Sequence, residues 1–312
     1  MPAFATHYLF LDELKNKIEK ETGFPLDVKV AGVGTQGPDI FIFHRLWPPF
    51  KIYKSLFGVA SILHRAKAGE LFEAFAEYLK SSKNPEIARS YIYGFILHYA
   101  LDRNCHPYVY AFQDMITKTN PHIHPLAAHN QVEHAADTYL LYHKRGVYPP
   151  SLFNPEETFA SGEKELEEIA LLMNFVIKKC FGRDVPLNEI KRAVTDTASL
   201  QKMLSDKKGT VVKIAKAVET PLGPVAHYFK PSASIKPTDL KLCDKYVNRN
   251  KNEWTSPYSG EKSFESFEEL FEKSKPDAIE LIKGFGSVFK GEKTGYEVTK
   301  NISFLTGLEV TE

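Results

Sequence analysis

The side chains whose types and spacing could do chemistry are concentrated in one stretch of the first half of the chain. His98, Asp102 and His106 stand four residues apart, so on a helix with about 3.6 residues per turn they lie on one face. His129 and Glu133 repeat this spacing further along the chain. Imidazole and carboxylate groups on facing helices are the ligands of zinc sites and of metal sites in helix bundles. We therefore expect a metal site between two helices.

A simpler interpretation is that these residues form the solvated faces of amphipathic helices, which holds for most single pairs of this kind. The flanks of the first triplet are apolar, however, at residues 95–97 and 99–101. A polar stripe cut into an apolar helix is costly to bury unless something pairs with it. Seven of the eleven histidines also fall within residues 98–143. Two such helices in succession favour the metal site.

Periodic apolar residues predict helices along most of the chain, and these helices would position the ligands. The expected helices lie at about 6–21, 58–80, 86–106, 125–146, 155–181, 187–205, 210–229 and 263–290, with another between 231 and 260. Pro107 is expected to end the helix of the first triplet and to leave a loop over 107–124. Since almost no strand is expected, the predicted class is all-α, a multi-helix bundle with the metal cluster between helices.

Length and composition restrict the domain organisation, the partners and the disulfide content that can be expected. A chain of 312 residues can bury a large core, and we expect a helical domain over 1–230 with a helical C-terminal extension over 231–312 packed on it. Lys and Arg number 40 against 39 Asp and Glu, so charge gives no reason to expect a nucleic-acid partner. The three cysteines are far apart and do not indicate a disulfide framework.

The sequence shows neither a membrane-spanning segment nor a signal peptide for secretion. No apolar run reaches the roughly 18 residues that a membrane-spanning helix needs, and the best run is interrupted at His44 and Arg45. The start of the sequence has no basic segment followed by an apolar one, as a signal peptide would have. We therefore expect a cytoplasmic protein without a transmembrane segment.

A glycine-rich stretch suggests a second type of site. Gly32, Gly34 and Gly37 satisfy the G-x-G-x-x-G pattern of dinucleotide-binding folds. Pro38 follows directly, no amphipathic helix opens there, and no acidic residue lies about twenty residues on. We therefore reject a dinucleotide site and expect an irregular loop that delivers Asp39 to a buried position.

Taken in order, these motifs resemble those of the zinc-dependent phospholipase C family, which has an all-α fold and a trinuclear zinc site. The resemblance covers roughly residues 5–230. It is strongest in Leu97-His98-Tyr99-Ala100-Leu101-Asp102 with the following His106-Pro107, in His129-x-x-x-Glu133, and in the turn Gly37-Pro38-Asp39.

The resemblance implies two zinc ions, and a third if the start of the chain supplies ligands. The first ion would be held by Asp39, His64, His98 and a bridging Asp102. The second would be held by His106, His129 and Glu133. The third uses the amine and carbonyl of the N-terminal residue in this family, together with residues that correspond here to His7 and Asp102. Family members begin with a tryptophan, whereas this sequence begins Met1-Pro2.

The function implied by the resemblance is hydrolysis of a phosphodiester or phospholipid-like substrate. Zinc ions bridged by a carboxylate lower the pKa of bound water to about 7 and hold phosphoryl oxygens. Asp39 is the candidate catalytic residue that would orient or deprotonate this water. A single-strand-specific nuclease, which shares the metal architecture, is the alternative enzyme. A non-catalytic helical binding protein stabilised by its metals is a third possibility. The sequence does not predict the oligomeric state.

Overall fold

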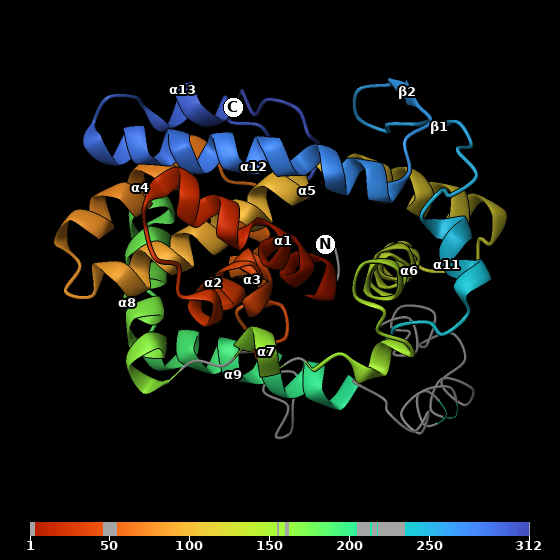
Figure 1. Cartoon of the computed structure of the whole chain (residues 1–312), viewed down its shortest axis with the longest axis horizontal. Coiled ribbons are helices and arrows are strands. Elements are labelled where there is room, and N and C mark those ends of the chain that lie inside the picture. Colours follow the sequence, from red (N-terminus) through yellow and green to blue (C-terminus); the bar gives the residue numbers. More distant parts are fainter. Residues whose placement is uncertain are drawn as a thin grey trace.

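Two long helices form the middle of the fold and carry the predicted ligand motifs. They are α5 (Pro85–Thr119) and α6 (Pro125–Arg145), and they pack against each other. The structure is a computed structural model, and it describes residues 4–45, 55–154, 156–159, 162–204, 213, 217 and 235–311. In Figure 1, α5 runs behind α12 (Phe267–Lys290) in the upper part of the view, and α6 stands end-on at the right beside α11 (Leu240–Tyr246).

The remaining elements are mostly helical. In the first half they are α1 (Phe4–Thr22), α2 (Val28–Gly34), the 3-10 helix η1 (Gly37–Phe41), α3 (Phe57–His64) and α4 (Ala68–Ser81). In the second half they are η3 (Pro150–Leu152), α7 (Glu156–Phe159), α8 (Glu163–Phe181), α9 (Leu187–Leu204), α11 (Leu240–Tyr246), α12 (Phe267–Lys290) and α13 (Gly295–Thr299). The named strands of the described residues are β1 (Trp254–Thr255) and β2 (Lys262–Ser263), one short antiparallel pair. The predicted all-α class is confirmed.

Helix α5 is longer than predicted. Pro107 lies inside the helix instead of ending it, so the predicted loop over 107–124 was wrong for most of its length. An interior proline removes one backbone hydrogen bond and costs about 3 kcal/mol. Beyond it, however, Tyr108, Phe112 and Ile116 continue the apolar face and are buried. Fully burying side chains of this size contributes about 1.5–3 kcal/mol each, which offsets the cost of the proline.

The glycine-rich stretch is also more regular than predicted, because α2 and η1 replace the expected irregular loop. Glycine is required where α2 crosses α5: a Cβ on Gly34 would lie 2.2 Å from the Tyr91 carbonyl oxygen, and a Cβ on Gly94 would lie 2.1 Å from that of Ala31. The close crossing brings η1, and Asp39 with it, against α5. The expectation that this stretch buries Asp39 is confirmed, since that residue is 7% exposed.

Other predicted helices differ in their boundaries. The helix expected over 58–80 is two helices, α3 and α4, and the one expected over 155–181 is α7 and α8. The helix predicted for 210–229 lies outside the described residues, apart from 213 and 217. Helix α12 corresponds to the helix expected over 263–290, and a capping box of Ser266 and Glu269 fixes its start.

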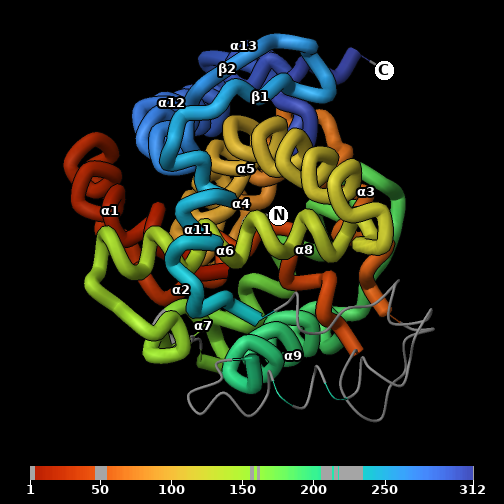
Figure 2. The backbone as a smooth tube through the Cα atoms, turned by 90° about the vertical axis from the view of Figure 1, so that its right-hand side faces the viewer, coloured from red at the N-terminus to blue at the C-terminus, as the bar shows by residue number. Residues whose placement is uncertain are grey.

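The C-terminal elements form a layer over α5. Helix α12 packs against α1, α4 and α5, and α13 packs against α4 (Figure 1; Figure 2). The rings of Phe72 and Tyr93 meet Phe285 of α12 edge to face, and Phe10 of α1 meets Phe271 in the same way. These contacts join α12 to helices of the first half of the chain, while the predicted division into a domain over 1–230 and an extension over 231–312 stays a prediction. None of the described helices is long and apolar enough to cross a membrane.

Candidate metal centre

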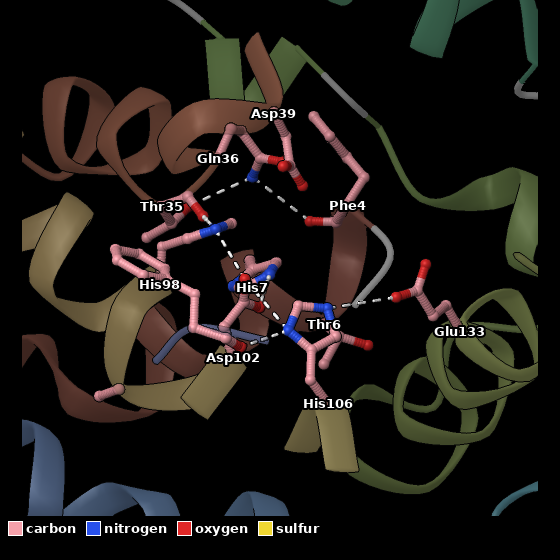
Figure 3. A network of polar contacts seen from close by, with 12 residues as sticks. Phe4, Thr6, His7, Thr35, Gln36, Asp39, His98, Asp102, His106 and Glu133 are labelled. Atoms are coloured by element: carbon pink, nitrogen blue, oxygen red, sulfur yellow. Dashed lines mark hydrogen bonds and ion pairs between the residues drawn. The ribbon is translucent and has the colours of Figure 1, made fainter. Parts of the chain in front are cut away.

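The eight residues predicted as ligands come from five helical elements and converge on the interior of the molecule. All of them are buried. By element they are His7 on α1, Asp39 on η1, His64 at the end of α3, His98, Asp102 and His106 on α5, and His129 and Glu133 on α6. Figure 3 shows the side chains from α1, η1 and α5 pointing toward one another, with Glu133 facing His106 from α6. Within α5 and within α6, the four-residue spacing therefore places the candidate ligands on one face of the helix, as predicted.

The ligand atoms form three groups in which all atoms lie within 4.8 Å of one another. The groups are His7, Asp39 and His98; His64, His98 and Asp102; and His106, His129 and Glu133. The first two share His98 and form one continuous cluster. We call these two together the Asp102 cluster and the third the His106 group.

Asp102 is placed to bridge two positions within its cluster. One carboxylate oxygen, Oδ1, lies 3.3 Å from Nε2 of His7. The other, Oδ2, lies 3.0 Å from Nε2 of His98 and 3.7 Å from Nε2 of His64. Nε2 of His64 also lies 3.2 Å from Oδ1 of Asp39. Each oxygen of one buried carboxylate thus faces different histidines.

These spacings fit zinc. Four ligands at about 2.0–2.1 Å from a tetrahedral ion lie about 3.3 Å from one another, in the middle of the measured range. Apart from these close approaches to one another, the facing atoms have no hydrogen-bond partner among the described residues: Nε2 of His7, His64 and His98, Oδ1 of Asp39 and both oxygens of Asp102. Leaving buried polar atoms in this state costs free energy, and a shared cation would satisfy all of them. The donors are nitrogen and oxygen only, as in catalytic zinc sites.

Hydrogen bonds to the opposite ring nitrogen orient four of the histidines. In each case Nδ1 lies within hydrogen-bond distance of an oxygen, so in the neutral ring Nδ1 carries the proton and Nε2 offers its lone pair to a metal. The acceptors are Thr35 O for His98 at 3.0 Å, Ala60 O for His64 at 2.9 Å, Phe304 O for His106 at 2.6 Å and Gln113 Oε1 for His129 at 3.2 Å.

Burial and charge shift the pKa values in opposite directions within the site. Burial lowers the pKa of His106 to about 3 and holds that of His129 well below its usual value. Burial raises the pKa of Glu133 well above the ordinary range of a carboxyl group. At His98 burial acts to lower the pKa, but the Asp102 carboxylate outweighs it and the pKa is raised. At Asp102 burial opposes ionisation, yet the neighbouring histidines hold its pKa well below the usual value.

These shifts predict how zinc affinity depends on pH. A raised pKa means that His98 and Glu133 retain protons to higher pH in the zinc-free protein. Zinc binds only their deprotonated forms, so binding must release these protons and the affinity must rise as pH rises. We expect the zinc affinity to increase steadily as the pH is raised, with proton release detected by calorimetry in buffers of different ionisation enthalpy. An affinity independent of pH would contradict this reading.

Two residues near the centre were not predicted to belong to it. Phe304 lies 198 positions from His106, whose ring it orients through its carbonyl, and no short-range spacing could reveal such a pair. Gln113 was missed because it lies six residues beyond Pro107, where the sequence suggested a loop. Tyr110, on the same part of α5, places its ring 4.9 Å from His129.

Two other polar residues near these motifs have structural roles. His44 lies closer to Asp39 in the sequence than His64 does, yet its Nε2 lies 3.0 Å from Glu189, away from the cluster. Asp137, one turn after Glu133, accepts hydrogen bonds from the backbone N–H groups of Ala5 and Thr6 and so holds the start of α1. The predicted role of the first residue in a third metal site lies outside the described residues.

Comparison with known proteins agrees with this geometry. No curated protein and no solved structure matches the chain. A family model described as zinc dependent phospholipase C matches residues 6–199, which is more than half of the chain and includes all eight predicted ligands. The chain therefore belongs to the zinc-dependent phospholipase C family.

Proposed function

We propose that this protein is a zinc-dependent phosphodiester hydrolase that acts on a phospholipid-like substrate. The observation that carries the proposal is the bridging position of Asp102, whose two oxygens face different histidines at 3.0–3.7 Å. A carboxylate in this position is what a site with adjacent metal ions needs. The Asp102 cluster supplies ligands for one zinc ion at His64 and His98 and, across the Asp102 carboxylate, for a third at His7, while the His106 group supplies ligands for the second.

The chain's own residues have distinct tasks in this reaction. Bound zinc would polarise the phosphoryl oxygens and acidify a water molecule. Asp39 would orient that water or accept its proton, since it lies at the edge of the cluster and is 7% exposed, whereas Asp102 has no exposure. Thr35 and Phe304 fix the ring orientations of His98 and His106 through their carbonyls. The burial of these residues limits access of bulk water to the reacting groups.

Charge favours a phospholipid-like substrate over a polynucleotide. The 40 basic and 39 acidic side chains leave the protein nearly neutral. Binding to nucleic acid depends on basic side chains that neutralise several phosphates, so a nuclease would be expected to carry a basic groove. The cytoplasmic location stays a prediction.

Replacement of Asp39 by asparagine tests the reaction. We expect Asp39→Asn to lower turnover of phosphatidylcholine in micelles by about 10²- to 10⁴-fold, because the amide cannot accept a proton from water. With zinc in excess, so that the site stays loaded, the free energy of unfolding should change little, because the amide has almost the same shape and keeps one oxygen for the ion. Hydrolysis is followed by release of the phosphorylated headgroup, with single-stranded DNA assayed in parallel and with a chelator as the blank.

Asp27→Asn is the matched control. Asp27 is exposed and caps α2, the helix that leads to η1, through the backbone N–H groups of Lys29 and Val30. Asparagine caps a helix about as well as aspartate, so this variant should retain full turnover. Wild-type turnover by Asp39→Asn would remove the proposed role of Asp39. Faster cleavage of DNA than of phospholipid would instead indicate the nuclease, and hydrolysis of neither by zinc-loaded protein would indicate a metal-stabilised binding protein.

A further inference from the structure

One turn near the C-terminus lies directly against the candidate metal centre. It comprises residues 302–307, and we call it the C-terminal turn. The carbonyl oxygen of Phe304 accepts the hydrogen bond from Nδ1 of His106 at 2.6 Å. The ring of Phe304 is 1% exposed and lies 5.9 Å from that of His64 and 6.3 Å from that of His98. A single residue therefore contacts three of the eight candidate ligands.

The C-terminal turn is held in place by hydrogen bonds to the body of the protein. The hydroxyl group of Tyr99, on α5, donates to the carbonyl of Ile302 at 2.8 Å. Just before the turn, the side-chain oxygen of Asn301 accepts from the backbone N–H of Gly69 on α4 at 2.9 Å. Within the turn, Gly307 donates its N–H to the Ser303 carbonyl. The Phe304 carbonyl is thus oriented independently of any bound metal.

His106 differs from the other histidines in the origin of its acceptor. Among the four histidines with a described Nδ1 acceptor, the other three take it from Thr35, Ala60 and Gln113, within the residues that the family model matches. The acceptor of His106 comes from residue 304, more than one hundred residues beyond the end of that match at residue 199. The nearest alternative is Oδ2 of Asp102, at 3.6 Å from the same nitrogen. A hydrogen bond from His106 to that oxygen would compete with the position of Oδ2 between His98 and His64.

We propose that the C-terminal turn is a positioning element of the metal centre. The Phe304 carbonyl fixes the proton of His106 on Nδ1 and turns Nε2 toward His129 and Glu133, while the Phe304 ring supports His64 and His98. This inference rests on the proposed zinc site. It assigns a role in metal binding to a segment that lies outside the residues shared with the family.

Gly307→Ala is the variant that displaces the turn. Gly307 has a φ of +67°, and an added Cβ would lie 2.8 Å from the carbonyl oxygen of Arg103 and 3.1 Å from Cγ of Pro107. Both neighbours belong to the rigid helix α5, so the turn itself must move. Loss of a hydrogen-bonding partner behind a metal-ligating histidine typically lowers metal affinity by 10- to 100-fold, and we expect a fall of about this size in zinc affinity.

Gly182→Ala is the matched control, because it carries the same backbone strain without the contact. Gly182 has a φ of +65°, and its added Cβ would meet nothing within 4 Å in the described part of the chain. Zinc affinity, measured by competition with a chromophoric chelator, should be unchanged in this variant. Equal zinc affinities in the two variants would overturn the proposal.

A measurement on the wild-type protein keeps the test independent of whether Gly307→Ala folds. Nitrogen-15 NMR of labelled histidines in the zinc-free protein should show the proton of His106 on Nδ1. A proton on Nε2 would overturn the positioning role. The two proposals fail separately: wild-type protein that takes up no zinc refutes the proposed function, while the histidine spectrum still decides the position of the proton. Zinc-loaded, active protein with equal affinities in both glycine variants refutes the positioning role alone.

Discussion

Removal of zinc is expected to lower the free energy of unfolding by about 4 kcal/mol for each ion that was present at a thousand times its dissociation constant. The cause lies in the buried atoms of the centre. Without ions, Nε2 of His7, His64 and His98 and both oxygens of Asp102 face only one another and have no other hydrogen-bond partner in the described residues, although all are buried. On the proposed function, zinc would bind these atoms in the folded state only, because the unfolded chain does not bring α1, α3 and α5 together.

Denaturant unfolding measures this effect. The midpoint should fall when a chelator is added to the purified protein and should return when zinc is added back in excess. Magnesium serves as the control, because it demands octahedral oxygen coordination and keeps its water, and a site rich in imidazole suits it poorly. A midpoint that is indifferent to the chelator, in protein shown to have lost its metal, would mean that the centre contributes nothing to folding.

The eight candidate ligands could be found from the sequence because most of the signal is local. A spacing of four residues on a helix determines which side chains share a face, whatever the rest of the molecule does. His98, Asp102 and His106 were therefore predictable as a set. His7, Asp39 and His64 stand alone in the sequence, and only the resemblance to a family connected them to the triplet. The structure brings all three to the Asp102 cluster.

The errors arose where packing outweighs a local preference. Pro107 disfavours a helix, yet α5 continues past it because the residues beyond it bury a continuous apolar face. Gly32 and Gly34 suggest a loop, yet they lie in α2, where Gly34 faces α5 and Gly32 faces Thr158 of α7 too closely for a side chain. The contact between Phe304 and His106 was invisible for a third reason, since hydrogen bonds to a backbone carbonyl require no particular residue type and leave no pattern in a sequence.

Replacement of the bridging carboxylate should have the largest effect of any single substitution. Asp102→Asn is expected to lower kcat/KM by at least about a thousandfold, since bound metal supplies several kcal/mol of transition-state stabilisation. The amide offers one oxygen in place of two, so it cannot face His7 and His98 with an acceptor at the same time. It also removes a negative charge that lies 3.0–3.7 Å from four histidines. Metal analysis should show loss of zinc from the Asp102 cluster.

Asp137→Asn separates this effect from the general cost of changing a buried aspartate. Asp137 is as buried as Asp102, but its oxygens accept from Ala5 and Thr6 and lie 3.4 Å from Lys236. The amide oxygen can keep the bonds to Thr6 while the other contacts are lost, which should cost about 1–3 kcal/mol of stability. This variant should therefore unfold more easily and still bind zinc. If the two variants lose zinc equally, burial and not the bridging position explains the result, and the two-oxygen arrangement at Asp102 loses its assigned role.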